Sequence, residues 1–92
     1  MYLGIYDVDG DPNELLSAYD RLIVMMPESQ VVFHACAIRE SGITIYDACP
    51  TKEVFEQFST SAEFRGATEA VGLPFPSRIE GLPLHAVRAK GM

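Results

Sequence analysis

The twenty residues QVVFHACAIRESGITIYDAC, residues 30–49, decide the fold of this chain. Residues 30–39 are apolar or β-branched on both alternating faces, which is typical of a strand that is covered on both sides. Ser41 and Gly42 form a turn signal, and residues 43–49 then read as a second strand. The sequence therefore predicts an antiparallel hairpin near the middle of the chain.

The sequence before the hairpin predicts one strand and one helix. Residues 1–8 (MYLGIYDV) are rich in Tyr, Ile and Val, and we expect Gly4 to mark a close approach of another element. Asp11 followed by Pro12 is typical of a helix N-cap and first helical position. The helix is expected to end at Pro27, and its apolar stripe has a 3.6-residue period: Leu15, Leu16, Tyr19, Leu22, Ile23 and Met26.

The sequence after the hairpin predicts a second helix and a last strand. Thr51 is expected to cap the helix, and Gly72 to end it. The cluster of hydroxyl residues at 59–61 predicts a bend or a break within it. Residues 78–89 read as a strand, which Pro83 restricts to a sheet edge or to a start after the proline.

The order strand, helix, strand, strand, helix, strand predicts one α+β domain over residues 1–92. It is of the ferredoxin-like βαββαβ type, with a four-stranded antiparallel sheet and both helices on one face. The opposite sheet face is then left without a cover inside the chain, so we expect a partner to cover it.

The composition also favours a partner. The chain has 92 residues, of which 48% are apolar. A domain of this size buries only about 60–65% of the surface that its unfolded chain exposes, so some apolar surface is expected in an interface, most simply that of a homodimer.

Charge and hydropathy argue against two classes of partner. Thirteen acidic residues and seven scattered basic ones give a formal net charge of -6, so the sequence shows no clustered basic surface of the kind that binds nucleic acid. The apolar stretches are far shorter than the ~20 residues that span a bilayer, so no membrane partner is expected. The chain begins with strand-like sequence, and its two cysteines read as reduced thiols. We therefore expect a cytoplasmic protein.

Four short runs carry a resemblance to a known group: Tyr46–Asp47, TKEVFEQF at residues 51–58, GLP at 72–74 and LPLH at 82–85. With the element order, they resemble the dimeric α/β-barrel superfamily, which includes the antibiotic-biosynthesis-monooxygenase-like (ABM-like) domains. The resemblance implies that two sheets pack face to face in a homodimer and enclose a cavity.

Several members of this superfamily are cofactor-free oxygenases or haem-degrading enzymes. Their Asn, Trp and His set does not carry over, because this chain contains no Trp. We expect no cofactor, and the fold alone does not transfer an activity.

The register of the hairpin decides which side chains share a face. If Ser41 and Gly42 form a two-residue loop, Cys36 pairs with Asp47 and His34 with Cys49. One face then carries His34, Cys36, Asp47 and Cys49 with Ile38 and Ile45, and the other carries Phe33, Ala35, Ala37, Tyr46 and Ala48. The small residues suit close helix packing, so the first face is expected to look into the dimer cavity. A loop longer by one residue would dissolve the cluster.

An acid beside an imidazole can set its tautomer and raise its basicity. The candidate catalytic residues are therefore His34 and Asp47, together with His85 of the last strand. The candidate ligand-binding residues are Tyr6, Cys36 and Tyr46. A buried structural histidine with a hydrogen-bond partner remains the favoured interpretation of His34.

Cysteine chemistry provides two weaker alternatives. His34-x-Cys36 with Asp47-x-Cys49 offers ligand types that zinc accepts, but single cysteines within apolar strands are usually small core residues, so no metal is expected. Cys49 lies ahead of the second helix, where a thiol can act as a nucleophile, although a packed strand end is the favoured reading.

Two functions follow from these observations. The first is an enzyme or binder of a small organic molecule, with a cavity at the sheet face. The second is a non-catalytic homodimerisation or regulatory module, in which partner side chains fill that space. The direction of His34 distinguishes them, because the case for an enzyme largely collapses if His34 and Asp47 point to the helices.

Overall fold

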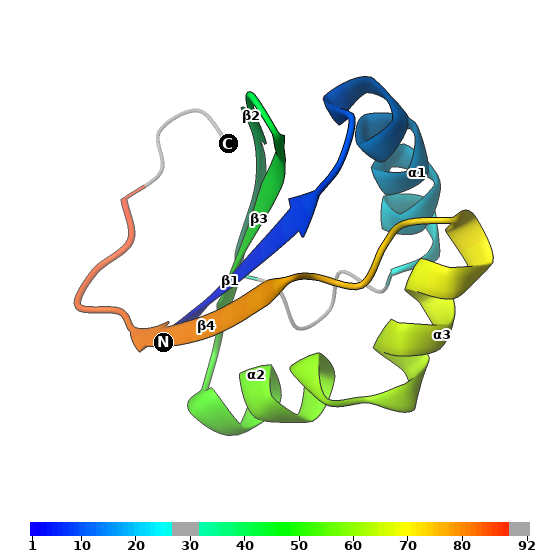
Figure 1. Cartoon of the computed structure of the whole chain (residues 1–92). Coiled ribbons are helices and arrows are strands. Elements are labelled where there is room, and N and C mark those ends of the chain that lie inside the picture. Colours follow the sequence, from blue (N-terminus) through cyan, green and yellow to red (C-terminus); the bar gives the residue numbers. More distant parts are fainter. Residues whose placement is uncertain (27–31, 89–92) are drawn as a thin grey trace.

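The computed structural model describes residues 1–26 and 32–88. Its strands form one antiparallel sheet in the order β2-β3-β1-β4, and the helices lie on one side of it (Figure 1). This arrangement confirms the predicted α+β, ferredoxin-like fold. The elements, in chain order, are β1 (Tyr2–Asp9), α1 (Pro12–Met25), β2 (Phe33–Arg39), β3 (Gly42–Cys49), α2 (Lys52–Ser59), α3 (Ala62–Val71) and β4 (Arg78–Pro83).

The helix ends follow the capping signals in the sequence. The backbone N–H of Glu14 donates to the Asp11 carboxylate at 3.0 Å, ahead of Pro12 at the start of α1. Thr51 caps α2, and Gly72 ends α3 in the left-handed region at φ 77°. The predicted interruption is a full break between α2 and α3, because the Ser61 hydroxyl begins a new helix by accepting from the N–H of Phe64 at 3.1 Å.

The core lies between the sheet and the helices. It includes Tyr6, Val8 and Ile43, which are at most 1% exposed. Gly4 and Gly81 face each other on β1 and β4 beneath the ring of Phe55 from α2. A Cβ atom would lie 2.8 Å from that ring at Gly4 and 2.6 Å at Gly81, so the predicted close approach at Gly4 is confirmed.

The hairpin differs from the predicted register by two residues. Glu40 and Ser41 form the loop, so His34 pairs with Asp47 and the predicted pairing of His34 with Cys49 is wrong. Gly42 belongs to the strand, where a Cβ atom would lie 2.2 Å from the Val8 carbonyl oxygen. Because the shift is an even number, the predicted sets of side chains still share their faces.

Two predictions about strand surroundings change. The first strand of the hairpin is the outermost strand β2, and it is not covered on both faces within the described chain, because Ile38 on its helix side is 66% exposed. The last strand is the other edge and ends at Pro83, so a strand that begins after the proline is wrong. Pro27, residues 30–31 and residue 89, which the predicted boundaries include, lie outside the described residues. In the described parts of the chain, no helix is both long and apolar enough to cross a membrane.

Candidate functional site

The sheet face opposite the helices is divided into an apolar half and a polar half. At the apolar half, neighbouring strands bring together two rows of side chains: Phe33, Ala48, Leu3 and Leu82, then Ala35, Tyr46 and Ile5, with Glu80 at the β4 end of the second row. The next rows carry charged and hydroxyl groups: Thr44, Asp7 and Arg78, then Arg39 and Asp9. The division runs across the strands, so one end of the same sheet face is largely apolar and the other is charged.

The apolar half holds a hollow of about 430 Å³ that is open to solvent. Its volume falls within the range of about 300–1,000 Å³ that is usual for small-molecule sites. Its lining combines apolar side chains with the phenol of Tyr46 and the guanidinium of Arg88: Leu3, Phe33, Ala35, Tyr46, Ala48, Leu84, Ala86, Val87 and Arg88.

One wall of the hollow comes from the segment after β4. The chain passes beside the bare face at residues 84–88 (Figure 1). The backbone N–H of Leu84 donates to the carbonyl oxygen of Met1 at 2.9 Å and anchors the start of this segment. The segment contributes Leu84 and Val87 to the lining of the hollow, so this wall is built from residues far in sequence from the hairpin.

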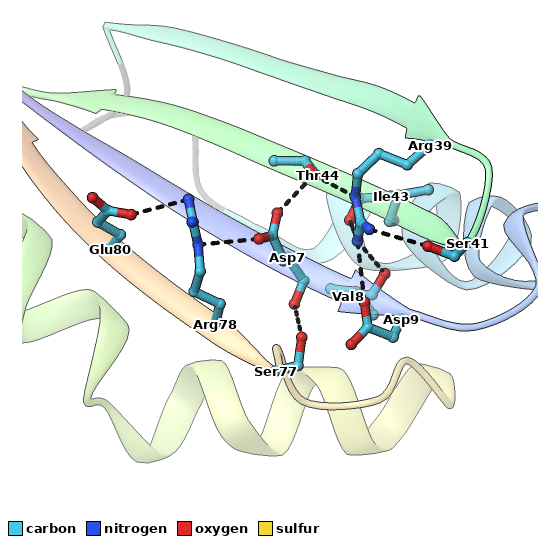
Figure 2. Close-up of polar contacts among 10 residues, drawn as sticks. All are labelled: Asp7, Val8, Asp9, Arg39, Ser41, Ile43, Thr44, Ser77, Arg78 and Glu80. Atoms are coloured by element: carbon cyan, nitrogen blue, oxygen red, sulfur yellow. Dashed lines mark hydrogen bonds and ion pairs between the residues drawn. The ribbon is translucent and has the colours of Figure 1, made fainter.

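The polar half is a continuous network across all four strands, which Figure 2 shows. The Asp7 carboxylate accepts from the Thr44 hydroxyl at 2.7 Å and pairs with Nε of Arg78 at 3.1 Å. Arg78 also pairs with Glu80 at 3.0 Å. These contacts hold the charged groups of β1, β3 and β4 to one another.

Arg39 extends the network to β2. Its Nε donates to Thr44 Oγ1 at 2.8 Å, and its Nη2 reaches the Asp9 carboxylate at 3.3 Å and the carbonyl oxygens of Val8 and Ile43 (Figure 2). The hydroxyl of Ser77 and the guanidinium of Arg39 lower the pKa of the Asp9 carboxyl. The guanidinium of Arg39 is thus occupied by internal partners.

His34 and Asp47 lie on the opposite side of the sheet, beneath the helices. Nδ1 of His34 contacts the Asp47 carboxylate, and Nε2 contacts the hydroxyl of Tyr19 from α1. The expectation that this face looks into a dimer cavity is therefore wrong. The physical reason is size: the bulky Ile43 and Ile45 fill the helix side, while the alanines leave the hollow on the bare side.

The Tyr19–His34–Asp47 chain uses both ring nitrogens of the histidine. With a neutral imidazole, Nδ1–H donates to the carboxylate and Nε2 accepts from the phenol. Burial, with the negative charges that Cys36 and Asp47 can carry, raises the pKa of Tyr19 to about 12, so its hydroxyl stays a donor. In this arrangement neither nitrogen is left to take a proton from a substrate.

The remaining helix-side candidates are buried or half-buried. Tyr6 is 1% exposed, and its hydroxyl has no hydrogen-bond partner among the described residues. Burial raises its pKa, and Asp47 and Cys49 add to the rise. Burial also raises the pKa of both thiols, with Asp20 contributing at Cys36 and Asp47 at Cys49. A raised pKa disfavours the reactive thiolate, which weakens the case for Cys49 as a nucleophile.

The predicted residues therefore separate in space. Tyr46 lines the hollow, whereas His85 is exposed beyond the end of β4 and is not part of the lining. The zinc alternative lacks a ligand set within residues 1–26 and 32–88, because no three His, Cys, Asp or Glu side chains come together there to hold a metal ion.

Comparisons with known proteins show the fold alone. No family model and no curated protein matches the chain. The solved structure of Rv0793 from Mycobacterium tuberculosis is similar, with a TM-score of 0.56 and 11% sequence identity over 98% of both chains. This likeness agrees with the ferredoxin-like topology described above.

Sequence reasoning missed most of the lining. Phe33 and Ala35 were expected beneath the helices, and Leu3 and Arg88 were not singled out. The sequence does contain a signal for Leu3. It lies three positions before the core residue Tyr6 on β1, and the alternation of side chains along a strand places the two on opposite faces. No sequence signal distinguishes Arg88 from the other arginines.

Proposed function

We propose that the chain binds a small, largely apolar organic molecule on its bare sheet face, and that a second copy of the chain closes over it. The observation that carries the proposal is the 430 Å³ hollow on a face that no helix of the described chain covers. Its lining has the character of small-molecule sites, with many apolar groups and few polar ones.

Binding is favoured over catalysis by the chemistry of the lining. The described residues that line the hollow include no carboxylate, imidazole or thiol. General acid–base catalysis needs a group with a pKa near the working pH, and nucleophilic catalysis needs an activated oxygen, nitrogen or sulfur. His34 and Asp47 lie on the other side of the sheet and contact each other, so the proposal gives them a structural role.

A homodimer is supported by the apolar half of the same face. Leu82, the β4 member of the first apolar row, is 44% exposed there. Two such faces would pack about 10 Å apart, which is the usual spacing between stacked sheets. An apolar ligand between them would then be shielded from water on both sides.

The binding proposal is tested with 2-naphthamide, a neutral aromatic probe, and two matched variants of β2. Ala35→Leu adds a side chain inside the hollow, whereas Ala37→Leu adds the same side chain on the same face outside it. Isothermal titration calorimetry should show binding to the wild type and to Ala37→Leu, and about tenfold or more weaker binding to Ala35→Leu, a loss of at least ~1.4 kcal/mol.

Equal affinity for the two variants would contradict the assignment of the site to the hollow. A dimer that binds no probe would favour the non-catalytic homodimerisation module instead.

A further inference from the structure

The arginine in the lining differs from every other arginine in the described chain. Arg39 and Arg78 pair with acids of the polar half, Arg21 donates to the Val71 carbonyl oxygen at 2.8 Å, and Arg65 stacks over Phe75 at 4.1 Å. Within residues 1–26 and 32–88, Arg88 makes no ion pair and no side-chain hydrogen bond.

Among residues 1–26 and 32–88, the lining of the hollow supplies no acidic group to compensate the charge of Arg88. The other residues that line the hollow are apolar apart from the phenol of Tyr46. A second copy that closes over this face would take the guanidinium out of water, and an unpaired charge in such a place is strongly unfavourable. A planar guanidinium pairs well with a carboxylate or another oxyanion, which it can bind through two hydrogen bonds.

We propose that the ligand of the hollow is an amphipathic organic anion, whose oxyanion group pairs with Arg88 while its apolar body lies against Phe33 and Leu3. This inference rests on the proposed function and adds the charge of the ligand to it. Attraction by the protein as a whole does not explain such a preference, because the chain carries a formal net charge of -6.

Two probes of the same shape test the inference. 2-Naphthoate is ionised at neutral pH, and 2-naphthamide is its uncharged counterpart. Calorimetry should show that the wild type binds the naphthoate about tenfold more tightly than the amide, as expected for a charge-assisted pair in a partly desolvated site. Arg88→Gln should remove this preference and leave the affinity for the amide unchanged.

Two further variants isolate the effect of Arg88. Lys52→Gln on α2 makes the same change in net charge at a residue outside the lining and should keep the tenfold preference. Arg88→Lys retains the positive charge without the planar guanidinium and should retain part of the preference for the naphthoate.

The two proposals fail in different ways. A wild type that binds both probes equally, or an Arg88→Gln variant that still prefers the naphthoate, would overturn the inference about charge while the hollow remains a binding site. A wild type that binds neither probe would overturn the proposed function and the inference together.

Discussion

At the scale of single residues, glycine decides how closely α2 approaches the sheet. Gly4 and Gly81 are neighbours on β1 and β4, and each lies against the ring of Phe55 at a distance that leaves no room for a Cβ atom. The same ring contacts Tyr2 and Tyr6, with ring centroids 5.4 and 6.2 Å away. The aromatic part of the core therefore depends on the absence of side chains at two sheet positions.

A pair of glycine substitutions tests this packing. Gly4→Ala should lower the free energy of unfolding by about 1–3 kcal/mol, because the new methyl group overpacks Phe55 and the Tyr6 hydroxyl. Gly66→Ala on α3, where nothing lies within 4 Å, should raise it by about 0.5–1 kcal/mol through helix propensity. Urea denaturation measures both changes. A Gly4→Ala variant as stable as the wild type would contradict the close approach.

The contribution of Asp9 in the polar half to the stability of the fold should depend on pH. Its pKa in the folded protein is lowered below the ordinary value of 3.8 by Ser77 and Arg39. A lowered folded-state pKa means that the ionised form stabilises the fold above the unfolded-state pKa, and that this contribution disappears as the pH falls through the folded-state value.

The wild type should therefore be more stable than Asp9→Asn at about pH 6, and the difference should shrink as the pH falls below about 3.8. Urea midpoints of the two proteins across this range check the expectation. A difference that stays constant, or grows in acid, would refute the role of the Asp9 charge.

At the scale of elements, local signals predicted the order and the ends of the structure well. As predicted, Asp11 and Thr51 cap the starts of α1 and α2, and Gly72 ends α3. The hydroxyl cluster at 59–61 separates α2 from α3. These features depend on a few neighbouring residues, so the sequence contains the relevant information. The hairpin register was missed because it depends on Gly42 meeting the Val8 carbonyl of a strand more than thirty residues earlier.

The facing of the sheet was also beyond local reasoning. Alternation correctly grouped His34 with Asp47 and Ala35 with Tyr46, but either group could lie beneath the helices. The choice is set by side-chain volume, since the large residues of β1 and β3 fill the space under α1 and α2. For this reason the candidate site lies on the face opposite to the predicted one. No local sequence pattern indicates that residues 84–88 line it.

The break between the helices can be tested at its cap. Ser61→Ala removes the hydroxyl that accepts from the N–H of Phe64 and should lower the free energy of unfolding by about 1 kcal/mol. Ser59→Ala is the matched control, because its hydroxyl donates only to the Glu56 carbonyl within α2 at 3.4 Å. Thermal unfolding should show a clear loss for the first and little change for the second. Equal effects would argue against a separate α3 cap.

At the scale of the whole molecule, the two faces of the sheet differ in what covers them. One face is filled by helices and by the Tyr19–His34–Asp47 chain, whereas the other carries the hollow beside a network of charges. The proposed dimer uses the second face, with the apolar half at its centre. The charges of the polar half already have internal partners, so they suit the rim of an interface.

Two substitutions by aspartate distinguish the faces. Leu82→Asp places a charge on the bare face and should weaken a homodimer at least tenfold, a change of about 1.4 kcal/mol or more. Ile38→Asp places it on the helix side of β2, at a residue that is even more exposed, and should leave association unchanged. Sedimentation equilibrium measures both. If Ile38→Asp weakened the homodimer and Leu82→Asp did not, the interface would lie at the edge of β2 and not on the bare face.

The most direct test of the central claim, that the bare sheet face is the binding surface, is a map of the bound probe by nuclear magnetic resonance. In ¹⁵N-labelled protein titrated with 2-naphthoate, the account predicts that amide shifts concentrate at Ala35, Tyr46, Ala48 and Val87, which line the hollow. Shifts concentrated at Tyr19 and His34 on the helix side would contradict it.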